Sequence, residues 1–63
     1  MNGEIIKKAK KQLEKIAKDN NEKYYEIVED TYEYKNGMIL IIYFDKEKTQ
    51  EKEHICINLE EIK

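Results

Sequence analysis

The sequence predicts an α+β fold, with one N-terminal amphipathic helix packed on a three-stranded antiparallel meander (αβββ) in two layers. Apolar residues recur at helical spacing in the first twenty residues, and segments of strand composition follow. An Asn-Gly pair, typical of hairpin turns, separates the first two of these segments. The 63 residues contain no repeat, linker or proline, so we expect a single domain over residues 1–63.

The helix is expected over about residues 3–20. On a helical wheel at about 100° per residue, one arc is apolar and the opposite arc is rich in lysine. Asn2 is placed to cap the first turn, and Asn20 or Asn21 to end the helix in a left-handed conformation. The apolar arc holds Ile5, Ile6, Ala9, Leu13, Ile16 and Ala17, and the opposite arc holds Lys7, Lys8, Lys10, Lys11, Glu14, Lys15 and Lys18.

Three strands are expected over about residues 23–34, 38–45 and 52–60. The first is rich in tyrosine and β-branched residues, and the second is apolar on both faces. In the third, Ile55, Ile57 and Leu59 alternate with more polar residues, which indicates one buried face. A charged turn over residues 46–51 joins the last two strands.

Two registers are compatible with a tight turn at Asn36 and Gly37. A two-residue turn pairs Tyr34 with Ile39, whereas a three-residue loop with Gly37 at positive φ pairs Tyr34 with Met38. We favour the second register because it separates apolar from polar residues better. A bulge near residues 29–30 would also turn Tyr25 and Ile27 inward. The favoured inner face holds Val28, Tyr32, Tyr34, Met38, Leu40, Ile42 and Phe44, and the outer face holds Glu29, Thr31, Glu33, Ile39, Ile41 and Tyr43.

The apolar stripe on the outer sheet face is the main functional clue. A chain this short buries only about 60% of its unfolded surface, and monomers seldom expose contiguous apolar patches. We therefore expect the stripe to bind protein, either a second copy in a homodimer or a different partner. The predicted interface residues are Ile39, Ile41, Tyr43 and Cys56.

An acidic surface along the first strand is predicted to steer a partner. Residues 1–20 carry a net charge of +3 and residues 21–63 a net charge of −5, so a basic helix lies on an acidic sheet. Such acidic surfaces attract basic proteins, including the nucleic-acid channels of enzymes. Very small, acidic proteins without motifs are often phage or mobile-element inhibitors, and an inhibitory or regulatory (anti-defence) binding role is the function we favour. The steering residues are Glu26, Glu29, Asp30 and Glu33.

The sequence argues against an enzyme and predicts no cofactor or metal. His54 and Cys56 share one face of the third strand, but the chain offers no second cysteine or histidine and no glycine-rich phosphate loop. The lone cysteine favours the reducing cytoplasm. The longest apolar run, residues 38–44, is far shorter than the ~20 residues of a membrane span.

Nucleic-acid binding through the helix is the alternative function. A stripe of lysines is able to lie along phosphates. Against it, the chain lacks arginine, which commonly reads bases, and its pI is 5.4. The predicted contacts are Lys7, Lys8, Lys11, Lys15 and Lys18.

Overall fold

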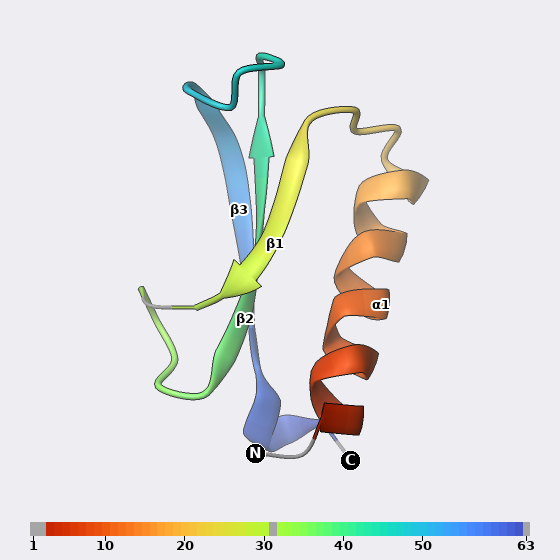
Figure 1. The fold of residues 1–63 in the computed structure, drawn as a ribbon, viewed down its shortest axis with the longest axis vertical. Coiled ribbons are helices and arrows are strands. Elements are labelled where there is room, and N and C mark those ends of the chain that lie inside the picture. The colour runs from red at the N-terminus through yellow and green to blue at the C-terminus, as the bar shows by residue number, and fades with distance from the viewer. Residues whose placement is uncertain (1–2, 31, 63) are drawn as a thin grey trace.

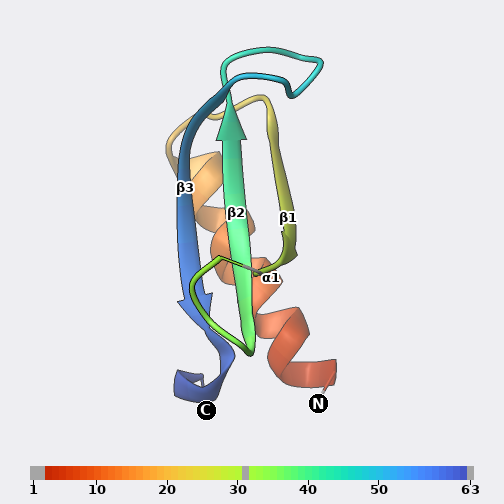
Figure 2. The ribbon, with the colours of Figure 1, turned by 90° about the vertical axis from the view of Figure 1, so that its left-hand side faces the viewer.

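The chain forms one helix packed on a three-stranded antiparallel sheet, as the sequence predicts. The computed structural model describes residues 3–30 and 32–62. Helix α1 covers one face of the sheet, and the strands lie in the order β1-β2-β3 (Figures 1 and 2). The elements are α1 (Gly3–Asp19), β1 (Tyr25–Glu29), β2 (Gly37–Tyr43), β3 (Glu51–Asn58) and the 3-10 turn η1 (Leu59–Glu61).

The core lies between α1 and the inner face of the sheet. The predicted apolar arc of the helix is confirmed: three of its residues are fully buried and the others pack against them. Alternate residues of β2 complete this core, and η1 closes its lower end. The buried cluster consists of Ala9, Leu13, Ala17, Met38, Leu40, Ile42 and Leu59.

The helix ends at a left-handed asparagine, which confirms that prediction. Asn21 has φ 57°, and its N–H donates to the carbonyl of Lys18 at 3.0 Å. The N–H of Glu22 donates to the carbonyl of Ala17 at 2.9 Å. These two bonds form a Schellman motif that turns the chain from α1 towards β1. The predicted cap Asn2 lies outside the described residues.

Strand β1 is shorter than predicted, and both hairpin registers were wrong. It ends at Glu29, which pairs with Met38, so a seven-residue loop over residues 30–36 connects it to β2. An odd shift in register exchanges the two faces of a strand. Val28 therefore lies opposite Ile39 on the outer face, whereas Tyr25 and Ile27 pack inward.

Gly37 is required for a different reason from the one predicted. It does not have positive φ, so the expected left-handed turn is absent there. A Cβ at this position would lie 2.8 Å from the Cβ of Tyr34, 2.9 Å from the carbonyl oxygen of Ile57 and 3.1 Å from the Cβ of Asp30. The loop and β3 close so tightly on β2 that no side chain fits between them.

Two further residues differ from the predicted inner face. Phe44 follows the end of β2 and is 64% exposed, and Tyr32 lies in the loop and is 68% exposed. The turn after Phe44 is organised by Asp45, whose carboxylate accepts hydrogen bonds from the N–H groups of Thr49 and Gln50, each at 3.0 Å. Phe44 is therefore outside the core, and its predicted place on the inner face is wrong.

Candidate protein-binding surface

The outer face of the sheet is the face that α1 does not cover. The pairing of the three strands aligns its residues in rows across the sheet: Glu26, Ile41 and His54 form one row, and Val28, Ile39 and Cys56 form the next. Beyond the first row, towards the β2–β3 turn, Tyr43 lies opposite Glu51. We call this surface the outer face.

The loop over residues 30–36 lies against part of this outer face. Figure 1 shows the loop on the side of the sheet opposite α1, and Figure 2 shows it crossing β2. Asp30 holds the loop in place, since its carboxylate accepts hydrogen bonds from the N–H groups of Tyr32 at 2.7 Å, Glu33 at 3.1 Å and Tyr34 at 3.1 Å. The backbone completes the attachment, with bonds from Asp30 N–H to the Gly37 carbonyl and from Leu59 N–H to the Asn36 carbonyl.

The prediction that a single chain leaves the apolar stripe exposed is wrong. Ile39 is 2% exposed and Ile41 is 7% exposed, although both lie on the outer face. Tyr43 and Cys56 are half-buried. The stripe is therefore mostly covered by the chain itself, and the argument for a homodimer built on exposed isoleucines no longer holds. The homodimer itself stays a prediction.

A polar, aromatic region remains accessible beside the loop. The hydroxyl of Tyr43 donates to the Glu26 carboxylate at 2.6 Å, joining β2 to β1. Nδ1 of His54 lies 2.9 Å from the Glu51 carboxylate, and the Tyr32 ring meets the His54 ring edge-on with centroids 5.9 Å apart. With Glu33 of the loop, these residues define the acidic aromatic patch: Glu26, Tyr32, Glu33, Tyr43, Glu51 and His54.

Titratable groups on the patch report a negative local potential. The pKa of Tyr43 rises to about 12, chiefly because its hydroxyl binds Glu26, with partial burial and the charges of Glu26 and Glu51 adding to the effect. The hydrogen bond to Glu51 raises the pKa of His54, partial burial opposes this, and the charges of Glu51, Asp30 and Glu33 raise it further. Both groups therefore favour holding their protons, as expected among carboxylates.

The four predicted steering residues do not share one surface. Glu26 and Glu33 belong to the patch. Asp30 is 4% exposed, and this burial raises the pKa of its carboxyl. The hydrogen bonds from three backbone N–H groups and from Cys56 together outweigh the effect of burial, so the pKa is lowered overall. Glu29 pairs with Met38 and therefore lies on the inner face of the sheet, the face that α1 covers. The acidic surface consequently depends on Glu51 of β3 as well as on β1.

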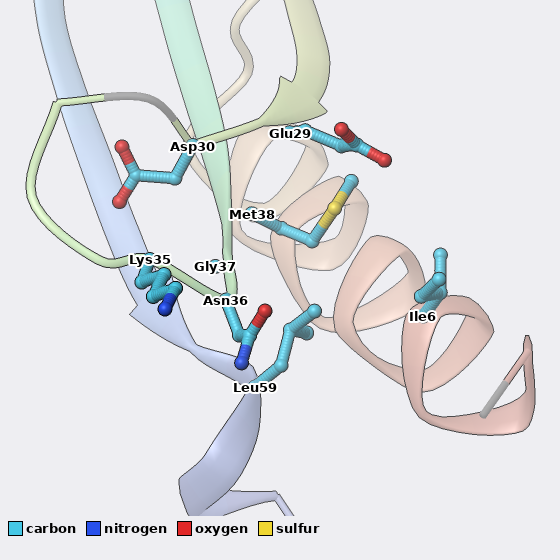
Figure 3. Close-up of a pocket in the computed structure, with 8 residues that line it drawn as sticks. All are labelled: Ile6, Glu29, Asp30, Lys35, Asn36, Gly37, Met38 and Leu59. Carbon is cyan, nitrogen blue, oxygen red and sulfur yellow. The ribbon is translucent and has the colours of Figure 1, made fainter. Parts of the chain in front are cut away.

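A small cleft lies between the first turns of α1 and the loop (Figure 3). Its volume is about 110 Å³, below the roughly 300 Å³ of ordinary ligand pockets. The Glu29 side chain extends towards Ile6, whereas the Asp30 carboxylate points away from Met38. We assign no ligand to this cleft. It is lined by Ile6, Glu29, Asp30, Lys35, Asn36, Gly37, Met38 and Leu59.

Cys56 lies beside His54 on the outer face, where the sequence placed it. Burial raises the pKa of its thiol to about 11, and the charge of Asp30 with hydrogen bonds to Asp30 and Glu33 adds to the shift. The thiol therefore stays protonated at neutral pH, which makes it a poor nucleophile and a poor metal ligand. Among residues 3–30 and 32–62, no three His, Cys, Asp or Glu side chains are arranged to hold a metal ion.

The predicted nucleic-acid contacts lie along the exposed side of α1, facing away from the sheet. Lys15 pairs with Asp19 and Lys18 with Glu14, each at 2.8 Å. Within the described part of the chain, the ammonium groups of Lys7, Lys10 and Lys11 have no carboxylate within 4 Å. We call these residues the lysine face: Lys7, Lys8, Lys10, Lys11, Lys15 and Lys18.

Sequence reasoning placed Tyr32 and Val28 on the wrong face. The signal that would have placed them correctly is Asp30, because aspartate is rare inside strands and often binds backbone N–H groups two to four residues ahead. Recognising that turn would have ended β1 before Asp30 and placed Tyr32 in a loop. His54 was expected on the outer face but not as part of a binding surface.

Comparisons of the chain with known protein families, with curated proteins and with solved structures found no match. No helix within the described ranges is long and apolar enough to cross a membrane.

Proposed function

We propose that this chain is a non-enzymatic protein-binding module whose acidic aromatic patch docks a basic surface of another protein. The observation that carries the proposal is the exposure of Tyr32, 68%, beside carboxylates that have no lysine partner. Among the described residues, Glu26 bonds to a tyrosine hydroxyl and Glu51 to a histidine, and no lysine nitrogen lies within 4 Å of either.

The chemistry of the patch suits lysine or arginine side chains. Carboxylates attract the charged groups, and tyrosine rings contact cations through their faces. Aromatic residues also contribute large contact areas with few rotatable bonds, which is why they are frequent in interfaces. A larger protein with a basic channel or groove is the kind of partner that we propose, and occupying that surface makes this chain an inhibitor or regulator. We place this activity in the cytoplasm, where Cys56 stays reduced.

A fluorescent oligolysine peptide tests the proposal by anisotropy. Replacing Glu26 and Glu51 with glutamine should weaken its binding by roughly 3- to 30-fold, taking each exposed charge pair at about 0.3–1 kcal/mol. The matched control replaces Glu47 and Glu60, which removes the same charge outside the patch. Equal weakening in both variants would mean that only net charge matters, and the proposal would fail.

Nucleic-acid binding by the lysine face remains the second candidate, because Lys7 and Lys11 are exposed on α1 and have no carboxylate within 4 Å among the described residues. A labelled single-stranded oligonucleotide should then bind with an affinity that falls steeply with salt. The double variant Lys7→Gln, Lys11→Gln should reduce this binding and leave oligolysine binding unchanged. No binding at low salt would eliminate this candidate.

A further inference from the structure

The patch and the lysine face lie on opposite sides of the molecule. In Figure 1 the loop that carries Tyr32 and Glu33 lies on one side of the sheet, and α1 lies on the other. The exposed lysines point away from the core, because Ala9, Leu13 and Ala17 occupy the side of α1 that contacts the sheet. One copy can therefore present both surfaces at the same time, and neither surface can reach the other within one molecule.

We propose that the acidic aromatic patch of one copy binds the lysine face of a second copy, so that copies associate head to tail. The inference rests on the proposed function in one respect, because it uses the same patch as the docking surface. The basic surface that the patch binds is then the lysine face of another copy, which becomes more available as the concentration of the chain rises.

Charge complementarity selects this contact over a symmetric dimer. A two-fold dimer places the same surface on both subunits. Patch against patch would bring Glu26, Glu33 and Glu51 of one copy to the same carboxylates of the other, and like charges in an interface are unfavourable. Helix against helix would similarly oppose lysines. Patch against lysine face brings Glu26, Glu33 and Glu51 to lysines, while Glu14 and Asp19 on the helix are already paired with Lys18 and Lys15.

The lysines are spaced along the helix so that several of them are able to meet the patch. Helix α1 has 17 residues, which span about 25 Å at 1.5 Å per residue. Lys7, Lys11 and Lys18 lie on one stripe of the helix, so several ammonium groups are able to meet the carboxylates and tyrosine rings of the patch together.

The contact is heterologous, which leaves one free surface of each kind at the two ends of every assembly. Association is therefore open-ended and grows with concentration. Exposed charges are screened by salt, with a Debye length of about 30 Å at 0.01 M and about 3 Å at 1 M. Growth at low salt and monomers at high salt are the expected behaviour.

Charge-swap variants test the inference by sedimentation velocity at about 0.01 M and about 1 M salt. The helix variant is Lys7→Glu with Lys11→Glu, and the patch variant is Glu33→Lys with Glu51→Lys. Each alone carries like charges on both surfaces and should be monomeric, whereas a mixture carries opposite charges at both contacts and should assemble with the two variants in alternation. The control, Glu47→Lys with Glu60→Lys, should assemble as the wild type does. Circular dichroism checks that every variant keeps its helix.

The expected result is a weight-average mass that at least doubles for the wild type at low salt and returns to that of a monomer at high salt. A monomeric wild type at low salt, a closed dimer that stops growing, or a mixture no heavier than its components would each overturn head-to-tail association. Oligolysine binding to the wild type at the same low salt separates the two ideas. If the peptide binds while copies do not associate, the inference fails and the proposed function stands.

Discussion

The two faces of the sheet are both covered, but by different physical means. The inner face packs on α1 through aliphatic side chains, and Leu13, Leu40 and Ile42 are fully buried there. On the outer face Ile39 and Ile41 are also buried, and a loop that a single carboxylate organises lies against part of that face. Aliphatic packing fills the centre of the inner face, whereas the loop leaves tyrosines and carboxylates accessible on the outer face. The functional proposals follow from that difference.

The inner face should give the largest loss of stability when it is truncated. Leu40→Ala or Ile42→Ala removes a fully buried side chain and should cost about 2–5 kcal/mol of unfolding free energy. Such a loss is a large fraction of the stability of so small a domain. Urea unfolding followed by circular dichroism measures it. Costs below about 0.5 kcal/mol at both sites would show that α1 does not pack on this face.

A substitution at Gly37, where the loop and β3 close on β2, should give the next largest loss of stability. Gly37→Ala introduces a methyl group within 3 Å of Tyr34 and Ile57 and should cost about 1–3 kcal/mol, as overpacking does. Gly3→Ala is the matched control, because nothing lies within 4 Å of its added methyl group. Thermal melts compare the two variants. If Gly37→Ala were as well tolerated as Gly3→Ala, the tight closure of the loop on β2 would be wrong.

The stability of the 30–36 loop on the outer face should depend on pH, whereas the packing of α1 on the inner face should not. Because the pKa of Asp30 is lower in the folded state than in the unfolded chain, its stabilising effect is complete above about pH 3.9 and is lost as the pH falls through the folded value. Asp30→Asn should remove this dependence and increase amide hydrogen exchange at Tyr32, Glu33 and Tyr34.

Asp45 provides the control for that experiment, since it organises the turn after β2 in the same way. Asp45→Asn should leave exchange in the 30–36 loop unchanged and should affect Thr49 and Gln50 instead. If the loop amides exchanged equally fast in the wild type and in Asp30→Asn, the carboxylate would not be what holds the outer cover.

The helix and the inward-facing residues of β2 were predictable from the sequence, whereas the two faces of β1 and the cover of the outer face were not. The apolar residues from Ile5 to Ala17 recur at helical spacing, and β2 is an unbroken apolar run. Both patterns indicate buried residues directly. The loop depends on hydrogen bonds that three backbone N–H groups donate to the Asp30 carboxylate, and their one sign in the sequence is an aspartate inside a segment of strand composition. The Asn-Gly pair also misled, because Gly37 is present for close packing and not for positive φ. The predicted patch consequently missed Tyr32, His54 and Glu51.

The smallest expected effect is a pH dependence of binding at the patch. Protonation of His54 adds a positive charge beside Glu51, Glu33, Asp30 and Tyr32, so oligolysine should bind less tightly as the pH falls from about 8.5 to about 5.5. The midpoint should lie above the ordinary histidine value of about 6.5, since the pKa of His54 is raised. His54→Gln should abolish the dependence. An unchanged profile in that variant would assign the titration to another group.

We propose that the outer face, and not the helix, docks a basic protein surface. Titration of ¹⁵N-labelled chain with oligolysine at about 0.15 M salt, followed by amide chemical shifts, tests it most directly. The largest shifts should fall at Glu26, Tyr32, Tyr43, Glu51 and His54, with little change along α1. Shifts concentrated on α1, or no saturable shifts at the patch, would contradict it.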